Sequence, residues 1–313
     1  MALIEDGGAV GVSIAGPAAT PRIVVVVASL GRPDELSTLL AHLENQSVKP
    51  SRVILSVTDR ADAPAAVGAN VEVVVGPKGS SPQRNLGIRL ALAAGCDVMV
   101  FLDDDYVPTA RALELFCKVL ADRPDVVGVT GTVIADGIRG PGIPTELAEE
   151  LVLRYEHEAP PLTTTCVDTT GLYGCNMAFR ASAIGDCRFD ENLPLYAWQE
   201  DIDFSRQMRS SGRLVRSLAA TGVHRGVKRA RAPGFQLGWA QVVNPAYLVR
   251  KGTMPFTFAV ALVIRNVIAN HLRALAPEPW VDRRGRVRGN WAGILEVLRG
   301  RIDPSAVLNR ISR

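Results

Sequence analysis

The sequence has few of the features that define several common classes of protein. Only 5 of its 313 residues are cysteines, and none forms a CxxC pair, so neither a zinc site nor a disulfide framework is indicated. No run of 18 or more apolar residues is free of charge, which argues against a membrane-spanning helix. The N-terminus carries acids where a signal peptide needs bases. We therefore expect a cytoplasmic protein with reduced thiols and a loose lead-in over residues 1–20.

Acidic residues are missing from one long interval, although the net charge of the whole chain is only +3. No Asp or Glu lies between Asp203 and Glu278, while arginines and lysines recur throughout that stretch. Such a basic segment favours an anionic partner, which could be phosphate, nucleic acid or anionic lipid; the alternative is a solvated basic face. Aromatic residues are not interleaved with the bases, so we do not expect nucleic acid as a partner.

The first half of the chain alternates between strand and helix patterns. Residues 23–27 are a continuous β-branched run typical of a strand buried on both faces of a sheet, and Pro33 opens a helix with leucines on one stripe. Further strands are expected at residues 51–59, 70–76, 97–105 and 125–135, and further helices at residues 81–95, 109–124 and 198–212. The alternation predicts an α/β fold with a doubly wound, mainly parallel sheet.

Polar residues follow three of these strands. They occupy residues 29–32, residues 58–59 and residues 103–105. Because ligands of doubly wound sheets bind outside the carboxyl ends of the strands, we expect the three groups to meet at one edge and form one site.

Asp103, Asp104 and Asp105 are three adjacent acids at the end of a predicted buried strand. Side chains alternate along a strand, so Asp103 and Asp105 share one face and Asp104 turns away from it. Two carboxylates suit Mg²⁺ or Mn²⁺, which also binds phosphate oxygens, whereas the plainer alternative is a run of solvated turn acids. The pattern therefore favours a divalent metal and, beyond it, a nucleotide.

Three other groups could carry chemistry. Glu200 and Asp201 begin a helix, where they either complement its dipole or supply a general base for a hydroxyl. His224 follows an apolar strand, where it is either structural or a metal ligand, and an exposed basic loop is expected over residues 221–234. Arg84 and Asn85 lie at the start of a predicted helix, after the stretch "GPKGSSPQ". This stretch is either an ordinary loop and helix cap or a site where backbone N–H groups bind an anion, but it does not contain the Walker motif GxxxxGK[ST].

Taken in order, these segments resemble glycosyltransferase family 2, whose members use nucleotide sugars and have the GT-A fold. The matching stretches are "VVVVASLGRPDELSTLLAHLENQ", "VILSVTD", "SSPQRNLGI", "VFLDDDYVP", "GCNMAFR", "WQEDIDFSRQMRSSG" and "VHRG", which together span about two thirds of the chain. The resemblance implies a nucleoside-diphosphate sugar donor of the UDP, dTDP or GDP type and a Mn²⁺ or Mg²⁺ cofactor. It also implies a glycan or lipid-linked acceptor, in surface polysaccharide or glycoconjugate synthesis.

The resemblance also implies roles for individual residues. Those that would contact the donor are Ser29, Arg32, Asp59, Arg84, Asn85 and Asp103. Asp105, Asp103 and His224 would hold the metal, and Asp201 would be the catalytic base of an inverting transfer. The residues expected at the acceptor are Asn176, Arg180, Trp198 and Glu200.

The chain departs from processive family members, which carry a QxxRW motif after the base. Here the nearest text is "FQLGW", without the arginine, so we expect single additions. A sugar nucleotidyltransferase is one alternative, although "SLGRP" has fewer glycines than such an enzyme needs after its first strand. The other alternative is a non-catalytic nucleotide-sugar-binding protein at a membrane.

The expected organisation is a catalytic domain over residues 21–232 followed by a helical, basic appendage over residues 233–313. Within the catalytic domain the nucleotide-sugar half extends to about residue 135, and the acceptor half follows it. Residues 254–275 are rich in Phe and aliphatic residues but contain Arg265, which favours an interfacial helix at the inner face of the cell membrane, a core helix or a subunit contact. Leu295 and Leu298 are expected to pack back on the body.

Overall fold

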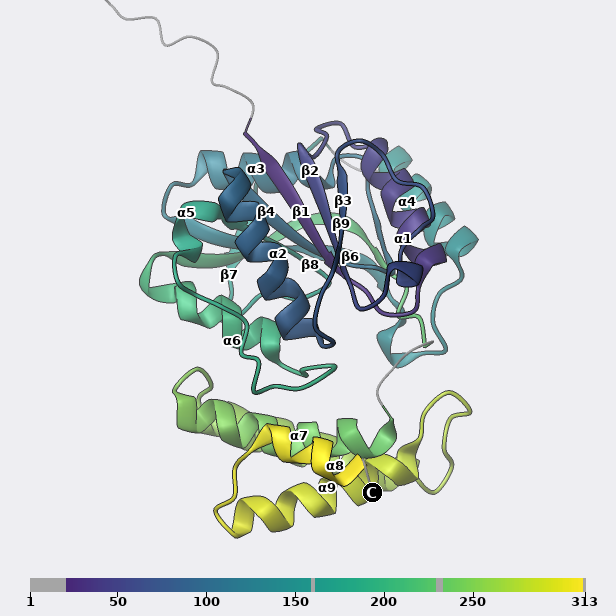
Figure 1. Cartoon of the computed structure of the whole chain (residues 1–313), viewed down its shortest axis with the longest axis vertical. Coiled ribbons are helices and arrows are strands. Elements are labelled where there is room, and N and C mark those ends of the chain that lie inside the picture. Colours follow the sequence, from purple (N-terminus) through teal and green to yellow (C-terminus); the bar gives the residue numbers. More distant parts are fainter. Residues whose placement is uncertain (1–20, 159–160, 229–232, 312–313) are drawn as a thin grey trace, which may run out of the picture.

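The computed structural model describes residues 21–158, 161–228 and 233–311. The expected lead-in over residues 1–20 lies outside this part of the chain, as do Arg229 and Arg231 of the basic segment. An α/β body is followed after residue 233 by a layer of helices that lies along one end of the body (Figure 1).

The strands form one sheet in the order β3–β2–β1–β4–β8–β6–β9–β5, and β7 pairs with β9 beside this path. Their bounds are β1 (Ile23–Ala28), β2 (Arg52–Val57), β3 (Val71–Val75), β4 (Val98–Asp103), β5 (Tyr106–Pro108), β6 (Val126–Asp136), β7 (Cys166–Asp168), β8 (Asn176–Arg180) and β9 (Arg213–His224). The neighbours β3, β2, β1 and β4 run parallel, as do β6 and β9. Strands β5, β7 and β8 join antiparallel, which the sequence pattern did not predict.

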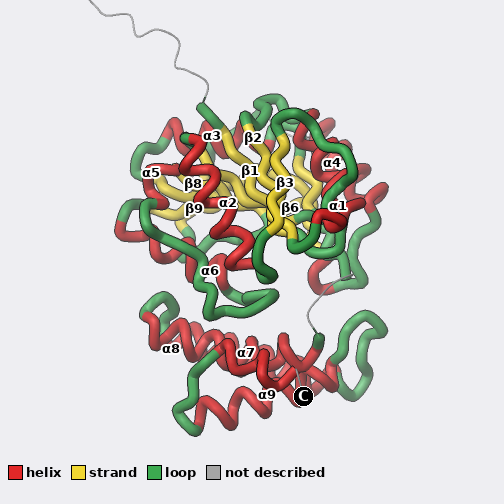
Figure 2. Tube along the Cα trace, viewed as in Figure 1, coloured by secondary structure: helices red, strands yellow, loops and turns green. Residues whose placement is uncertain are grey.

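Helices cover both faces of the sheet, as Figure 2 shows for the strands in yellow and the helices in red. The helix bounds are α1 (Pro33–Glu44), α2 (Ser80–Ala94), α3 (Ala112–Asp122), α4 (Thr145–Glu158), α5 (Ala181–Ile184), α6 (Glu200–Gln207), α7 (Gly234–Lys251), α8 (Phe256–Arg273), α9 (Arg283–Leu298) and α10 (Leu308–Ile311). Short 3₁₀ turns are η1 (Arg60–Asp62), η2 (Gly137–Arg139), η3 (Met208–Ser210) and η4 (Pro304–Val307).

Strand β1 explains why both faces are covered. Val25 and Val27 pack in a cluster with leucines of α1 and α3, whereas Val24 and Val26 pack in a second cluster with Ile88 of α2. Burying each such side chain contributes about 1.5–3 kcal/mol, so a β-branched strand of this kind is stable only between two layers of helices. The doubly wound α/β fold predicted from the sequence is confirmed.

An apolar cluster and a group of ion pairs are among the contacts that attach the helical layer of α7, α8 and α9 to the body. Leu193 and Ala197 of the body pack against Leu248, Met254 and Ala259 of the layer. Beside this cluster, the Lys251 ammonium lies 2.7 Å from a carboxylate oxygen of Asp190 and 2.7 Å from one of Asp203. The helical appendage expected after residue 233 is therefore packed on the body.

Two local predictions are wrong. Residues 221–224 belong to β9 rather than to an exposed loop, because Thr221, Val223 and His224 are buried by pairing with neighbouring strands. On α9, Leu295 and Leu298 do not pack back on the body, since their exposed fractions are 48% and 79%. Among the helices of the described residues, none is long and apolar enough to cross a bilayer.

Candidate metal and nucleotide-sugar site

A cavity of about 380 Å³ opens at the edge where the parallel strands β1 and β4 end. Ala28 and Asp103 are register partners there, so the residues that follow both strands lie side by side. The predicted site residues that line this cavity are Ser29, Arg32, Arg84, Asp103, Asp105 and His224. The sequence patches after these two strands therefore meet in one site, as expected from parallel strand order.

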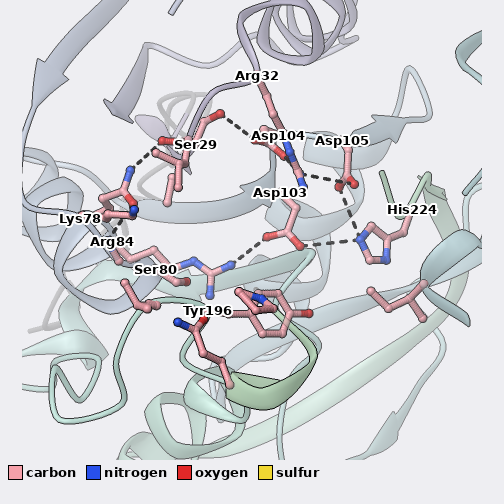
Figure 3. A pocket seen from close by; sticks show the side chains of 18 residues that line it. Ser29, Arg32, Lys78, Ser80, Arg84, Asp103, Asp104, Asp105, Tyr196 and His224 are labelled. Carbon is pink, nitrogen blue, oxygen red and sulfur yellow. Dashed lines mark hydrogen bonds and ion pairs between the residues drawn. The ribbon is translucent and has the colours of Figure 1, made fainter. Parts of the chain in front are cut away.

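Asp103, Asp105 and His224 bring one potential ligand atom each to within 4.8 Å of one another. His224 Nε2 lies 3.5 Å from Asp105 Oδ1 and 3.8 Å from Asp103 Oδ2. The histidine reaches the acids because β9 pairs with β5, with Tyr106 and His224 in register. Figure 3 shows the three side chains pointing toward one another at the wall of the cavity.

The other ring nitrogen of His224 is held by side chains outside this cluster. Its Nδ1 lies 2.9 Å from Asp136 Oδ1 and 3.0 Å from the Tyr173 hydroxyl, which donates in turn to Asp136 Oδ2 at 2.9 Å. A carboxylate that binds one histidine nitrogen fixes the ring so that the other nitrogen faces a ligand. Burial lowers the pKa of His224, but the carboxylates of Asp105 and Asp136 outweigh burial and raise it to about 10.

The acids themselves differ in environment. Burial alone would raise the pKa of Asp105, but the neighbouring His224 outweighs it and lowers the pKa to about 2. Its Oδ2 accepts a hydrogen bond of 2.7 Å from the backbone of Val227, which leaves Oδ1 directed at His224. Asp105 therefore stays ionised at neutral pH, as a metal ligand must.

The Asp104 carboxylate is not part of this cluster. Strand β4 ends at Asp103, so Asp104 and Asp105 lie in a turn rather than in the strand that the sequence pattern predicted. Its two oxygens bind the Ser29 hydroxyl at 2.6 Å and the Arg32 guanidinium at 2.8 Å. Burial raises the pKa of Asp104 to about 6 against the opposing charge of Arg32. The middle acid thus fixes two predicted donor-binding residues.

The donor set of this cluster fits a divalent cation. Two carboxylates and one imidazole nitrogen are typical ligands of Mn²⁺, and carboxylates alone are typical of Mg²⁺. The carboxylates that raise the pKa of His224 would also favour a metal cation at this point, and a metal ion would compete with a proton for the ring nitrogen.

Arg84 lies at the centre of a buried network beside the cluster. Its Nη2 donates to Asp103 Oδ1 at 2.8 Å, and its Nη1 donates to Glu200 Oε1 at 2.9 Å. Its guanidinium also lies over the Phe189 ring, 5.3 Å from the ring centroid. Burial and the neighbouring Asp201 raise the pKa of Glu200 to about 8, with Arg84 opposing them.

Asp201, the predicted base, follows Glu200 at the start of α6. Its oxygens accept hydrogen bonds of 2.8 Å from the backbone nitrogens of Gly174 and Ile202. Burial raises its pKa, against the two hydrogen bonds. Asp201 is not among the residues that line the cavity. It is linked to the cavity through Gly174, whose carbonyl accepts a hydrogen bond of 3.2 Å from Arg84, and Arg84 in turn binds Asp103.

Two predicted donor-binding residues lie outside the cavity lining. The Asp59 carboxylate caps η1 by accepting from the backbone of Ala61 at 2.8 Å, because the chain turns into a 3₁₀ helix directly after β2. The Asn85 amide is buried and donates to the Phe189 carbonyl and to Glu191. The patch after β2 is therefore not joined to the other two, which corrects the expectation of one three-part site.

The predicted acceptor residues are scattered. Asn176 is fully buried and binds Thr130, Tyr106 and Thr221. Arg180 pairs in register with Val98, the first residue of β4, and so lies about 16 Å along the strand from Asp103.

Arg180 donates to the backbone carbonyl of Leu120 and is part of the opposite edge of the sheet. Trp198 lines a neighbouring cavity, and Glu200 is held by Arg84. The structure brings neither residue into the cavity: Asn176 pairs with Leu102 near the site but its side chain is buried in the core, and Arg180 lies at the far end of β8.

Sequence reasoning missed several residues that shape the site. Asp136 and Tyr173 orient His224. Of these two, only Asp136 could have been suspected from the sequence, because it is an acid at the end of a predicted strand. Gln83 donates to the carbonyls of Ser29 and Ser56 and so joins α2 to the ends of β1 and β2. Lys78 and Tyr196 also line the cavity.

Comparison with known proteins defines the fold. No family model matches the chain, and no curated protein matches its sequence. Among solved structures, TarS residues 1–349 of S. aureus in complex with UDP-GlcNAc matches with a TM-score of 0.52 and 14% identity, over 91% of this chain and 83% of that chain. The fold is therefore the GT-A fold of glycosyltransferases.

Two further structures are similar at lower scores. A mannosyltransferase of Pyrobaculum calidifontis in complex with GDP-Man and Mn²⁺ has a TM-score of 0.49 and 18% identity, over 94% of this chain and 80% of that chain. Glucosyl-3-phosphoglycerate synthase of Mycobacterium tuberculosis has a TM-score of 0.45 and 17% identity, over 76% of this chain and 82% of that chain.

Proposed function

We propose that this protein is a metal-dependent glycosyltransferase of the family 2 type. It transfers one sugar at a time from a nucleoside-diphosphate sugar of the UDP, dTDP or GDP type to a hydroxyl group of a glycan or lipid-linked acceptor. The observation that carries the proposal is the cluster of Asp103, Asp105 and His224 at the wall of a cavity at the carboxyl edge of β1 and β4. The GT-A fold supports it, and the similar TarS structure holds UDP-GlcNAc.

The cavity has the charges that a diphosphate needs. Asp103, Asp105 and His224 would hold Mn²⁺ or Mg²⁺, which when bound neutralises the charge that develops on the departing nucleoside diphosphate. Arg32 and Lys78 line the same cavity and add positive charge there. Asp104 keeps the Arg32 guanidinium in place through its 2.8 Å ion pair, so this cation is oriented before the donor binds.

Asp201 is the proposed catalytic base. Burial raises its pKa, which makes its carboxylate a better proton acceptor than an exposed aspartate. It would take the proton from the acceptor hydroxyl while the hydroxyl oxygen bonds to the anomeric carbon. The bond from that carbon to the diphosphate oxygen breaks on the opposite side, so the configuration inverts.

A thermal-shift screen of nucleoside diphosphates and their sugars, with and without Mn²⁺, tests the donor part of this proposal. We expect one nucleotide family to raise the melting temperature only when Mn²⁺ is present, because binding to the folded state stabilises it. Product analysis with the matching sugar donor separates this function from sugar nucleotidyl transfer. Release of nucleoside diphosphate supports glycosyl transfer, and release of pyrophosphate contradicts it.

We also propose that α8 lies on an anionic membrane surface. Every fourth residue from Phe256 to Leu272 is apolar, and all five are exposed: Phe256, Val260, Ile264, Ile268 and Leu272. No acid occurs in α8, and the exposed Arg265 and Arg273 follow directly after Ile264 and Leu272 of this stripe, although Arg273 also lies 3.3 Å from Glu278. Each basic residue near an anionic leaflet contributes about 1 kcal/mol, so the charge favours lipid headgroups as the occupant.

Co-sedimentation with phosphatidylglycerol vesicles tests the membrane proposal. We expect binding at low salt, weaker binding at high salt, and loss of binding in an Ile264→Asp/Ile268→Asp variant. The matched control is Leu153→Asp on α4 of the body, since Leu153 is also exposed, at 66%. If the wild type stays in the supernatant, or if the double variant instead splits a dimer, α8 is not a membrane surface.

A further inference from the structure

A second cavity, of about 730 Å³, lies between the body and the helical layer. Its walls come from η2, from the loop over residues 196–199, from the start of α7, and from α8 and α9. Ile138, Tyr196 and Pro233 line both this cavity and the one that holds the metal cluster. The two cavities are therefore neighbours that share a wall.

The charge of the second cavity is strongly one-sided. Its lining contains six basic residues: Arg139, Lys228, Arg265, Arg273, Arg283 and Arg286. The lining contains one acid, Asp282, whose carboxylate caps α9 by accepting from the backbone of Gly285 at 2.7 Å. Within the described residues, the charge of this cavity is thus positive.

Some of these cations are already neutralised by neighbouring acids. Arg283 is buried and pairs with Glu278 at 2.8 Å, and Arg273 lies 3.3 Å from the same carboxylate. In contrast, Arg139 and Arg265 make no ion pair with any acid in the described part of the chain. These two exposed arginines come from opposite walls, one from η2 and the other from α8.

The rest of the cavity combines aromatic and polar surfaces. Trp198 and Trp280 line it, and Gln199 Oε1 is buried without a hydrogen-bond partner among the described residues. Leu195, Ala197 and Gln199 have positive φ angles of 57°, 48° and 78°, a conformation that costs such residues about 1–3 kcal/mol each. The segment between the two cavities is therefore held in a strained shape, as binding segments often are.

We propose that the second cavity binds the phosphate group of an anionic acceptor and so selects acceptors that carry a phosphate. This inference rests on the proposed function and names the acceptor class of that site. A phosphate ester carries up to two negative charges and three acceptor oxygens, which match arginine guanidiniums better than a neutral sugar does. The tryptophans suit the apolar or sugar part of the same molecule.

Because the two cavities adjoin, an acceptor bound by its phosphate in the second cavity can reach the first. With its phosphate held among arginines of the second cavity, the acceptor extends past Tyr196 toward the metal cluster in the first cavity. The unpartnered oxygen of Gln199 can accept a hydrogen bond from an acceptor hydroxyl. The phosphate belongs either to a lipid anchor or to a soluble glycan, and both present the same group to the cavity.

Calorimetric titration in EDTA tests this inference, because removal of divalent metal excludes binding at the metal cluster. The probes are octyl phosphate, inorganic phosphate, octanoate and the neutral octyl glucoside. We expect octyl phosphate to bind saturably and octyl glucoside not to bind. In an Arg139→Gln/Arg265→Gln variant we expect the affinity for octyl phosphate to fall about tenfold or more, since each arginine supplies a charge-assisted contact.

The matched control is Arg284→Gln/Arg288→Gln, which removes two exposed arginines of α9 that do not line the cavity. This variant should bind octyl phosphate as the wild type does. Octyl phosphate binding more tightly than inorganic phosphate supports a lipid-linked acceptor, and equal binding supports a phosphorylated glycan.

The proposal is overturned if neither phosphate binds, if octanoate binds as well as octyl phosphate, or if both double variants lose affinity equally. All variants are first checked for a wild-type circular dichroism spectrum, and exposed positions were chosen so that folding is retained. Failure of the donor screen with Mn²⁺ would contradict the proposed function instead, because these titrations contain no metal.

Discussion

At the scale of single residues, the Asp105 carboxylate is held by contacts on both of its oxygens. Val227 binds one of its oxygens and His224 faces the other, while Arg32 lies 3.8 Å away. These contacts lower its pKa to about 2 and fix the carboxylate before any metal binds. In the neighbouring Asp103, Arg84 binds one oxygen at 2.8 Å and the other lies 3.8 Å from His224 Nε2.

An Asp105→Ala variant should lose the metal dependence of donor binding. Without this carboxylate the cluster keeps one acid and one histidine, too few for a firm Mn²⁺ site. Calorimetry with the nucleotide found in the screen should then give the same weak affinity with Mn²⁺ and with EDTA. An unchanged Mn²⁺ effect would mean that the metal binds at other residues.

An Asp201→Asn variant should keep donor binding and lose transfer by about 10²–10⁴-fold, which is the usual contribution of a general base. The asparagine side chain has the same shape but only one oxygen, so it can accept from the backbone of either Gly174 or Ile202 and not from both. A wild-type circular dichroism spectrum of the variant is therefore the check that the local fold survives. The rate of nucleoside diphosphate release and the donor affinity are the two measurements. A similar loss in both would contradict the role of a base.

At the scale of elements, the helical layer depends on a close crossing of α7 and α9. A Cβ atom on Gly238 of α7 would overlap the backbone of Arg286, and one on Gly289 of α9 would overlap the carbonyl oxygen of Phe235. Only glycine allows the two backbones to approach this far. The crossing then buries Trp239 and Val243 in a small cluster with Val307.

A Gly289→Val variant should therefore separate α7 from α9 and destabilise the layer by about 1–3 kcal/mol, as overpacked positions do. Thermal unfolding followed by tryptophan fluorescence measures the effect, because Trp239 lies at the crossing. The control is Gly140→Val, since a Cβ at Gly140 meets no atom within 4 Å. Equal stability of the two variants would contradict the close crossing.

At the scale of the whole molecule, the body and the layer are joined by the ion pairs of Lys251 with Asp190 and Asp203. Although burial opposes it, the contact with Lys251 lowers the pKa of Asp190 below its ordinary value of 3.8. A lowered pKa in the folded state contributes stability that is present above the ordinary pKa and lost as the pH falls through the folded pKa. Lys251 has a raised pKa, so its contribution is present below 10.5 and lost as the pH rises through the raised value.

We therefore expect the stability difference between wild type and Asp190→Ala to be constant from neutral pH down to about pH 5 and to shrink below pH 4. Urea unfolding at a series of pH values gives this difference directly. Asp186→Ala is the control, because Asp186 is exposed and has no ion pair in the described residues. A difference that grows toward acid would show that the pair does not join the two parts.

The amino-acid pattern alone was sufficient to predict the alternating α/β order and the strand that the three acids follow. These follow from local rules, namely the period of a strand, the caps of a helix and the parallel order of βαβ units. It also indicated helices after residue 233, whereas the exposure of the apolar stripe on α8 is known only from the structure, because a core helix and a subunit contact were equally open.

The distant residues that join the site are known only from the packing of the folded chain. His224 reaches the acids because β9 pairs with β5, and Asp136 and Tyr173 then orient its ring. Arg180 lies away from the cavity because β8 runs antiparallel to β4, and Asn176 is turned into the core by its contacts with Thr130, Tyr106 and Thr221. Both depend on long-range pairing that no local pattern contains. The second cavity is likewise made by packing, since its arginines come from segments more than 100 residues apart in the chain and meet only where the helical layer is packed on the body.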